Sequence, residues 1–188
     1  NQWDYVISDP TKSSKYVTER YAFIWKTKHI KIKNRGRLLS ELDAEIDREP
    51  FLLDFYVRNR QFTILNFHSR PFNKDPMSEI RALTKFVLNS LGSSVIVAGD
   101  FNVDEKELVF DELKSRGFKA SITNQKTTLK RSCDRNNYLN YPIDNIFYAK
   151  GLTNTGCGIV DFVGYCGNLE NARKLSDHLP VFLKFRLK

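Results

Sequence analysis

The chain has 188 residues, of which 41% are hydrophobic and 28% charged, as expected for one ordinary globular domain with a sizeable core. No run approaches the roughly 18 apolar residues of a membrane span, which excludes a helical span in this sequence. Lys and Arg outnumber Asp and Glu by 30 to 22, giving a net charge of +8. This surplus favours a polyanionic partner, either nucleic acid or an anionic membrane surface.

Four segments in the first half of the chain have the alternating or aromatic-rich patterns of strands. They are Trp3–Ser8, Tyr21–Lys26, Phe51–Val57 and Gln61–Phe67. The last two form a predicted hairpin across the turn Arg58-Asn59-Arg60. The basic run from Lys26 to Arg37 is interpreted as a solvated edge strand that its charge protects from aggregation, with nucleic-acid contact as the alternative. Residues 38–46 are expected to form a loop or a short helix.

A helix and the most buried strand of the sheet follow. Asp75 and Pro76 are a typical N-cap and first residue of a helix. The stretch Val95–Asn102 begins with four apolar residues, which suit a strand buried on both faces. If the extended backbone continues to its end, Asp100 and Asn102 point to the same side of the sheet. A carboxylate and an amide would then stand side by side at the end of a rigid strand.

The second half of the chain is predicted to alternate between strands and irregular segments. A helix is expected over Glu105–Arg116, a loop over Thr127–Asn140, and strands over Phe118–Thr123, Pro142–Tyr148, Gly156–Gly167 and Leu179–Leu187. With eight or nine strands and two helices in total, the pattern indicates an α+β protein with mixed sheets. Cys133, Cys157 and Cys166 have no metal-type spacing. We expect free buried thiols, with one bridge and an odd thiol as the alternative.

Polar residues collect where the predicted strands meet loops. They are Glu19, His68, Asp100, Asn102, Asp144, Asp177 and His178. Taken singly, each has an ordinary structural explanation, because an Asp before a strand is usually a turn former and a lone His at a strand end is usually a surface residue. Their repetition favours a functional interpretation, since binding and catalytic residues concentrate on loops held by a rigid scaffold.

The chemistry that these residue types share is the hydrolysis of a phosphate ester. Carboxylate and amide oxygens suit Mg²⁺, which needs only one or two carboxylates besides water. A His supported by a carboxylate can orient an attacking water or stabilise negative charge. The set has too few Cys and His for a structural zinc site. The chain also has neither a Gly-rich phosphate loop nor a Gly-x-Ser-x-Gly elbow.

Six short motifs, in order along nearly the whole chain, resemble those of the endonuclease/exonuclease/phosphatase superfamily and its deoxyribonuclease I-like branch. They are Thr18-Glu19-Arg20-Tyr21, Arg48-Glu49-Pro50, Phe67-His68-Ser69, Gly99-Asp100-Phe101-Asn102, Ile143-Asp144-Asn145-Ile146 and Ser176-Asp177-His178-Leu179-Pro180-Val181. The resemblance implies a four-layer αββα sandwich, in which two mixed β-sheets pack face to face with helices outside and the site lies at one edge.

The same resemblance implies two His–carboxylate pairs. His178 with Asp144 would act on the water or the scissile phosphate. His68 with Glu19 would form the second pair on the opposite side and serve leaving-group protonation. The residues themselves indicate only oxygen ligands and His partners, and these roles come from the resemblance.

The remaining roles also follow from the resemblance. Asp177 and Asp100 would hold the metal, which is Mg²⁺ with Mn²⁺ or Ca²⁺ as alternatives. Asp100 and Asn102 would orient the nucleophile and the phosphate oxygens, and Arg48 would contact phosphate. Family members also carry, before the point that matches Asn1, a strand with an Asn and a strand ending in Gln-Glu, whose Glu binds the metal. Neither has a counterpart here, so we expect a single domain that lacks the first strands of the fold.

The leading hypothesis is a monomeric, Mg²⁺-dependent phosphodiesterase, in particular a DNA endonuclease, which the missing metal ligand would leave inactive in the chain as given. A phospholipid or sugar-phosphate phosphoesterase of the same family is an alternative, because a basic surplus does not separate DNA from anionic lipid or a phosphorylated small molecule. A non-catalytic nucleic-acid-binding or scaffold protein that kept the fold is the other alternative.

Overall fold

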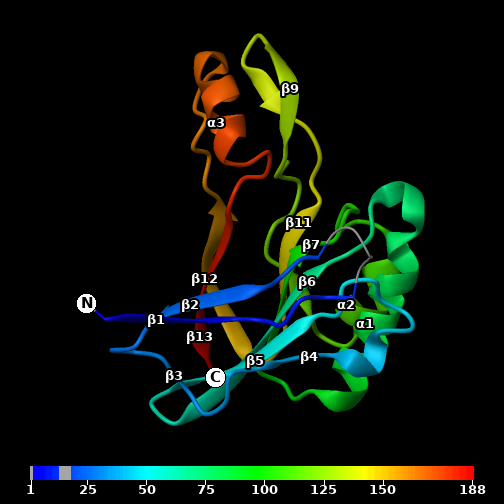
Figure 1. Cartoon of the computed structure of the whole chain (residues 1–188), viewed down its shortest axis with the longest axis vertical. Coiled ribbons are helices and arrows are strands. Elements are labelled where there is room, and N and C mark those ends of the chain that lie inside the picture. The colour runs from blue at the N-terminus through cyan, green and yellow to red at the C-terminus, as the bar shows by residue number, and fades with distance from the viewer. Residues whose placement is uncertain (1, 13–17) are drawn as a thin grey trace.

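The computed structural model describes residues 2–12 and 18–188, and its centre is one large β-sheet (Figure 1). The strands of this sheet lie in the order β3 (Lys31–Ile32), β5 (Phe51–Val57), β6 (Arg60–His68), β7 (Val95–Asp100), β11 (Asp144–Tyr148) and β8 (Lys119–Ala120), and β4 (Arg37–Leu38) also pairs with β5. Strands β6 and β7 are parallel, whereas the other pairs are antiparallel. The sheet is therefore mixed, as predicted.

The hairpin of β5 and β6 closes through a two-residue turn. Arg58 and Asn59 have φ values of 47° and 66°, and positive φ at both central positions is typical of a type I′ turn, whose twist matches that of the strands. The basic run before the hairpin forms the short strands β3 and β4 on the β5 side of the sheet. The predicted edge position is confirmed for β3.

Two helices cover one face of the sheet (Figure 1). Helix α1 (Pro76–Ser90) begins as predicted, with the Asp75 side chain accepting a hydrogen bond from the Ser78 amide at 3.3 Å. Helix α2 (Asp111–Ser115) follows the 3₁₀ turn Leu108–Phe110. Their apolar side chains share one core with the sheet residues that point the same way; its buried members include Leu65, Phe67, Ile80, Leu83, Val87, Val95, Val97, Phe101, Phe110 and Phe147.

Two antiparallel strand pairs cover the opposite face. The first pair is β1 (Trp3–Ile7) with β2 (Ala22–Lys26), and the second is β12 (Leu152–Ile159) with β13 (Val181–Leu187). They enclose a second core, which includes Val6, Trp25, Leu53, Phe55, Phe62, Ile96 and Tyr148, with Leu183 and Phe185 packed against it. The predicted α+β sandwich with mixed β-structure is therefore confirmed, whereas the prediction that the first strands of the family fold are missing stays a prediction.

A small lobe projects from one end of the sandwich (Figure 1). It contains the hairpin β9 (Leu129–Asp134) and β10 (Asn137–Leu139), residues 160–168 and helix α3 (Leu169–Leu175), and we call it the disulfide lobe because Cys133 and Cys166 are joined. The expectation of three free thiols is therefore wrong, and only Cys157 is free. The expected loop over Thr127–Asn140 is also wrong, since the lobe's own core, centred on Leu129, Tyr138 and Leu169, stabilises the hairpin.

Two further sequence predictions differ from the structure. The helix expected over Glu105–Arg116 is reduced to a 3₁₀ turn and α2, because the chain bends to bury Phe110 beside Phe101 and Phe147. The strand expected over Gly156–Gly167 begins and ends earlier, as β12. Residues 38–46 contain the 3₁₀ turn Ser40–Leu42, and two more turns lie at Phe72–Lys74 and Cys166–Asn168. Residues 2–12 and 18–188 contain thirteen strands and three α-helices, and none of these helices is long and apolar enough to cross a membrane.

Candidate active site

Three neighbouring strands of the large sheet each place one polar side chain at the same edge. In the sheet register, His68 at the end of β6 lies beside Asp100 at the end of β7, and Asp100 lies beside Asp144 at the start of β11. Side chains alternate between the two faces of a strand, and Phe67 belongs to the core under the helices whereas Ile96 belongs to the core under the strand pairs. His68, Asp100 and Asp144 therefore all project toward the strand-pair layer.

The strand-pair layer and the loop before β5 supply the partners of His68. Nδ1 of His68 lies 2.8 Å from Oε2 of Glu19, and Oε1 of Glu19 accepts a hydrogen bond from Nη1 of Arg48 at 2.8 Å. Burial alone would raise the pKa of the Glu19 carboxyl, but the hydrogen bond from Arg48 and the neighbouring His68 ring outweigh it and lower the pKa. Glu19 is therefore a carboxylate at neutral pH, held between a cation and an imidazole.

The second histidine enters from the loop before β13. Nδ1 of His178 lies 2.9 and 3.0 Å from the two oxygens of Asp144, and the buried Thr127 hydroxyl donates a 2.6 Å hydrogen bond to Oδ2 of Asp144. The hydrogen bond to Asp144 is the main reason that the pKa of His178 rises, to about 8, against the opposing effect of burial. His178 is therefore mostly protonated at neutral pH when no cation is present.

Asp100 lies between the two histidines. Its Oδ2 is 3.6 Å from Nε2 of His68 and 4.0 Å from Nε2 of His178. Burial, together with the negative charge of Asp144, raises the pKa of Asp100 above its usual value. The two pairs thus converge on one carboxylate, with the same Nε2 atom of each imidazole facing it.

The residues around Asp100 fit a divalent cation. One ligand atom each from Asp100, Asp144 and His178 lies within 4.8 Å of the others. Two carboxylates directly opposite each other on adjacent strands repel, and a cation between them removes that repulsion. Two carboxylate oxygens are also the number that a magnesium site commonly takes from a protein. Asp100 and Asp144 would therefore be the principal ligands.

Asn102 is not on the extended strand that the sequence suggested. Strand β7 ends at Asp100, and Asn102 has a left-handed backbone with φ of 55°. This turn lets the Asn102 amide N–H donate to Oδ1 of Asp100 at 2.8 Å, while Nδ2 of the side chain donates to the carbonyl of Ser69 at 3.1 Å. The expectation that an extended strand points Asp100 and Asn102 to the same side of the sheet is wrong, but the turn still keeps Asn102 next to Asp100.

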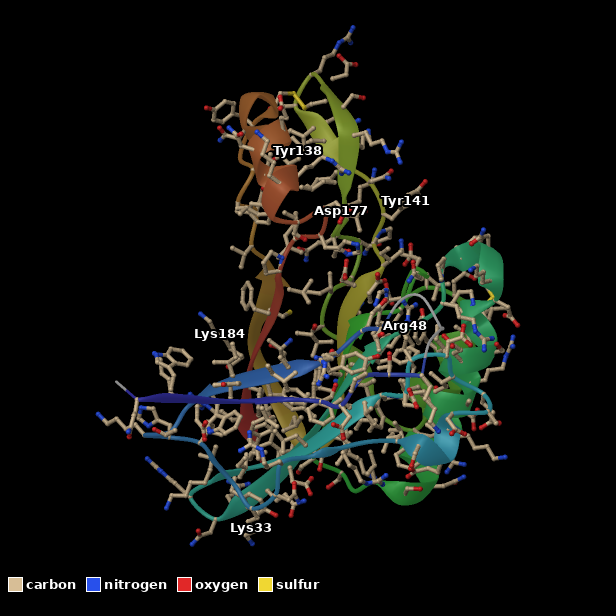
Figure 2. All side chains as sticks on the ribbon, viewed as in Figure 1. Lys33, Arg48, Tyr138, Tyr141, Asp177 and Lys184 are labelled. Carbon is tan, nitrogen blue, oxygen red and sulfur yellow. A yellow bond between two sulfur atoms is a disulfide. The ribbon has the colours of Figure 1, made fainter. Side chains whose placement is uncertain are left out.

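Two other predicted site residues have different surroundings from those expected. The Asp177 side chain is 61% exposed, and its nearest charged partner is Arg173, at 3.9 Å; it is not part of the Asp100–Asp144–His178 cluster (Figure 2 labels it at the base of the lobe). Arg48 donates to the carbonyls of His68 and Ser69 as well as to Glu19. Arg48 is thus bound by the protein at each of its nitrogens and braces the first pair, and its phosphate contact stays a prediction.

Thr127 is a site residue that no sequence pattern indicates. Its hydroxyl donates to Asp144 and also accepts hydrogen bonds from the amides of Ile143 and Asp144, at 3.2 and 3.1 Å. Only the folded structure identifies Thr127 as a site residue, because Thr127 is brought to Asp144 by the β-bridge between the neighbouring Thr128 and His178. The sequence around Thr127 is polar and has no strand pattern, so this contact cannot be predicted from it.

Comparisons with known proteins were made on both sequence and structure. No protein-family profile and no curated protein matches the sequence. Solved structures do match the fold, and one is an endonuclease/exonuclease/phosphatase family protein from Bacteroides thetaiotaomicron, with a TM-score of 0.65 and 17% identity over 99% of this chain and 76% of that chain.

Two other solved structures carry more specific names. One is a mannosyl-6-phosphatase from Bacteroides thetaiotaomicron VPI-5482, with a TM-score of 0.64 and 16% identity over 98% of this chain and 77% of that chain. The other is D. rerio TDP2 complexed with single strand DNA product, with a TM-score of 0.59 and 13% identity over 97% of this chain and 77% of that chain. The chain therefore has the fold of endonuclease/exonuclease/phosphatase proteins and spans about three quarters of the length of these solved chains.

Proposed function

We propose that this chain, which has the endonuclease/exonuclease/phosphatase fold, belongs to that family and provides the site of a metal-dependent phosphodiesterase acting on nucleic acid, DNA in particular. The observation that carries the proposal is the convergence of two His–carboxylate pairs on Asp100, with Nε2 of His68 and of His178 at 3.6 and 4.0 Å from the same oxygen. Such an arrangement offers one proton-transferring group on each side of a reacting phosphate.

The pair of His178 and Asp144 would act on the scissile phosphate and the attacking water. Asp144 holds Nδ1 of His178, so Nε2 is the nitrogen directed at the substrate. In its protonated form Nε2–H can donate to a phosphate oxygen, and in its neutral form it can accept a proton from water. A divalent cation bound at Asp100 and Asp144 would supply further neutralisation of the phosphate charge. Asn102 would add an amide beside the same phosphate.

The pair of His68 and Glu19 would serve the leaving group. Glu19 orients His68 through Nδ1, and Arg48 fixes Glu19 from the other side. Because three side chains are fixed by hydrogen bonds, Nε2 of His68 keeps its direction toward Asp100 without substrate. Proton transfer by a positioned side chain contributes typically ~10²–10⁴-fold to a rate, which sets the size of effect expected for either histidine.

Nucleic acid is the proposed substrate because of charge and similarity. The chain has a net charge of +8, and contact with many phosphates makes use of such a surplus, whereas a single phosphorylated sugar does not. The similar TDP2 structure contains a single strand DNA product. A mannosyl-6-phosphatase with the same fold makes a sugar phosphate the alternative substrate.

The proposal is tested with a supercoiled plasmid, single-stranded and duplex oligonucleotides, and mannose 6-phosphate, each with Mg²⁺ or with EDTA. We expect the complete protein to cleave a nucleic acid with Mg²⁺ and not with EDTA, and His178→Ala to lower the cleavage rate at least ~100-fold. His29→Ala is the matched control, because His29 is exposed and follows the far end of β2. Equal activity of His178→Ala and wild type, or release of phosphate from mannose 6-phosphate without any nucleic-acid cleavage, would contradict the proposal.

A further inference from the structure

A hollow of about 380 Å³ lies directly beside the candidate active site. Its walls are the side chains of Phe162, Leu175, Ser176, His178, Leu179 and Pro180. This volume falls within the ~300–1,000 Å³ typical of small-ligand sites. His178 therefore belongs both to the pair that faces the proposed phosphate and to the wall of this hollow. The part of a substrate that is attached to the phosphate on this side would lie next to the hollow.

The floor of the hollow is fixed and its rim is open. Leu179 is 2% exposed and belongs to the core of the disulfide lobe, against which Phe162 also packs. Leu175, at the end of α3, is 82% exposed. Helix α3 is tied to β9 by Arg173, whose Nη1 donates to the carbonyls of Leu129 and Lys130 at 2.9 and 3.2 Å. The hollow is thus formed before any ligand binds, and it leaves an apolar side chain in water.

The lining suits an apolar, planar group better than a polar one. Ser176 offers the one hydroxyl among the lining side chains, and its oxygen already accepts a 2.9 Å hydrogen bond from the amide of His178. A sugar placed here would lose hydrogen bonds to water without replacing them, which is unfavourable. A nucleobase presents an apolar face that can stack on Phe162 and contact the aliphatic side chains without needing specific hydrogen bonds.

The hairpin of the same lobe has a basic surplus, which suits contact with nucleic acid. Residues 126–140 contain four basic residues and one acidic residue: Lys126, Lys130, Arg131 and Arg135 against Asp134. Positive charge beside a stacking surface is the combination that binds single strands with little sequence preference. An acyl chain would fill the hollow equally well but would bring only one headgroup to this charge.

We propose that the hollow between Phe162, Leu175, Leu179 and Pro180 binds an unpaired nucleobase next to the scissile phosphate, so that the preferred substrate is a single strand or a frayed end. This inference rests on the proposed function, of which it names the substrate class. A base inside a duplex is stacked and paired and would have to be unstacked to enter. Because the lining supplies few hydrogen-bond donors, the base identity should matter little.

The binding test uses single-stranded oligonucleotides that carry 2-aminopurine at one position each, with EDTA present so that nothing is cleaved. We expect one position to change its fluorescence on binding, and Leu175→Ser to abolish that change. Leu108→Ser is the control, because Leu108 is 81% exposed but lies in the turn before α2. Both substitutions alter exposed side chains, so neither should prevent folding. A signal equal at every position, or unaffected by Leu175→Ser, overturns the inference.

The cleavage test compares an oligonucleotide with a second one that lacks only the base at the position identified by fluorescence. We expect removal of the base to lower kcat/KM by about 5- to 100-fold in wild type and by much less in Leu175→Ser. Equal cleavage of both oligonucleotides by wild type overturns the inference while leaving the proposed function standing. Cleavage of neither, with the fluorescence change present, overturns the proposed function and not the base site. Hydrolysis of phosphatidylcholine vesicles in preference to both would assign the hollow to an acyl chain.

Discussion

The hydroxyl of Thr127 provides the sharpest test of how the second His–carboxylate pair is held. It donates at 2.6 Å to Asp144, and Asp144 in turn orients Nδ1 of His178. We expect Thr127→Val, which replaces the hydroxyl by a methyl of nearly the same size, to free the Asp144 carboxylate to rotate. The variant should therefore keep its fold and lose activity.

The size of the loss follows from the hydrogen bond. A hydrogen bond to a charged group contributes about 1.5–3 kcal/mol. If all of it is expressed in the transition state, kcat/KM falls by about 10- to 150-fold, since about 1.4 kcal/mol corresponds to a factor of ten. Thr127 is fully buried and also accepts from two backbone amides, so about 1–3 kcal/mol of stability should be lost as well.

The assay is the initial rate of oligonucleotide cleavage, measured with urea unfolding on the same preparations. Thr127→Ser is the matched control, because it retains the hydroxyl and should keep most of the activity and most of the hydrogen bonding. If Thr127→Val cleaves as fast as wild type while it unfolds at lower urea, the hydroxyl stabilises the loop without positioning Asp144, and the reasoning fails.

Three other predictions concern the scaffold. A Cβ at Gly99, where φ is +147°, would lie 1.8 Å from the carbonyl oxygen of Phe67. Gly99→Ala should therefore separate β6 from β7 and lower the free energy of unfolding in urea by about 3 kcal/mol. A loss below about 1 kcal/mol would contradict this contact. In EDTA, the pKa of His178 is about 8 in the folded chain against 6.5 in the unfolded chain, so its stabilising contribution is complete below pH 6.5 and is lost as pH rises through 8. After a discount for its partial exposure, thermal melts should show that the free energy of unfolding falls by about 1 kcal/mol over this range. The same melts of His178→Gln should show no such fall. Reduction of the Cys133–Cys166 bond, whose partners are 33 residues apart, should lower stability by about 3–4 kcal/mol, with no effect of reductant on the melting of Cys133→Ser.

The parts of the fold that the sequence predicted well are those with local signals. The hairpin of β5 and β6 has alternating burial and a turn whose residues adopt positive φ, and α1 begins with the N-cap Asp75 followed by Pro76. The disulfide lobe has no such local signal, because its disulfide joins β9 to the 3₁₀ turn before α3 across 33 residues, and Arg173 of α3 donates to the carbonyl of Leu129. Long-range contacts of this kind cannot be read from periodicity.

The candidate site divides in the same way. Polar residues at strand ends marked His68, Asp100 and Asp144, and the β6–β7–β11 register explains why they meet, since parallel β6 and β7 end where antiparallel β11 begins. The sequence could not supply that register, nor the left-handed turn at Asn102. Thr127 was missed for the same reason, because its hydroxyl finds Asp144 only in the folded chain.

The two His–carboxylate pairs differ in their charged partners, and this difference supports the roles proposed for them. Glu19 is shared between His68 and the Arg48 guanidinium, so the charge of Glu19 is already balanced by a partly buried cation. Without a cation, Asp144 receives hydrogen bonds from the neutral Thr127 hydroxyl and from His178, and its charge raises the pKa of the imidazole to about 8. Under the proposed function, protonated His178 would attract the phosphate more strongly than His68, and the group attached to the phosphate on that side would meet the apolar hollow that His178 borders. The pair at His68 would then face the leaving group, to which Nε2 gives a proton from the protonated imidazole while Glu19 keeps Nδ1.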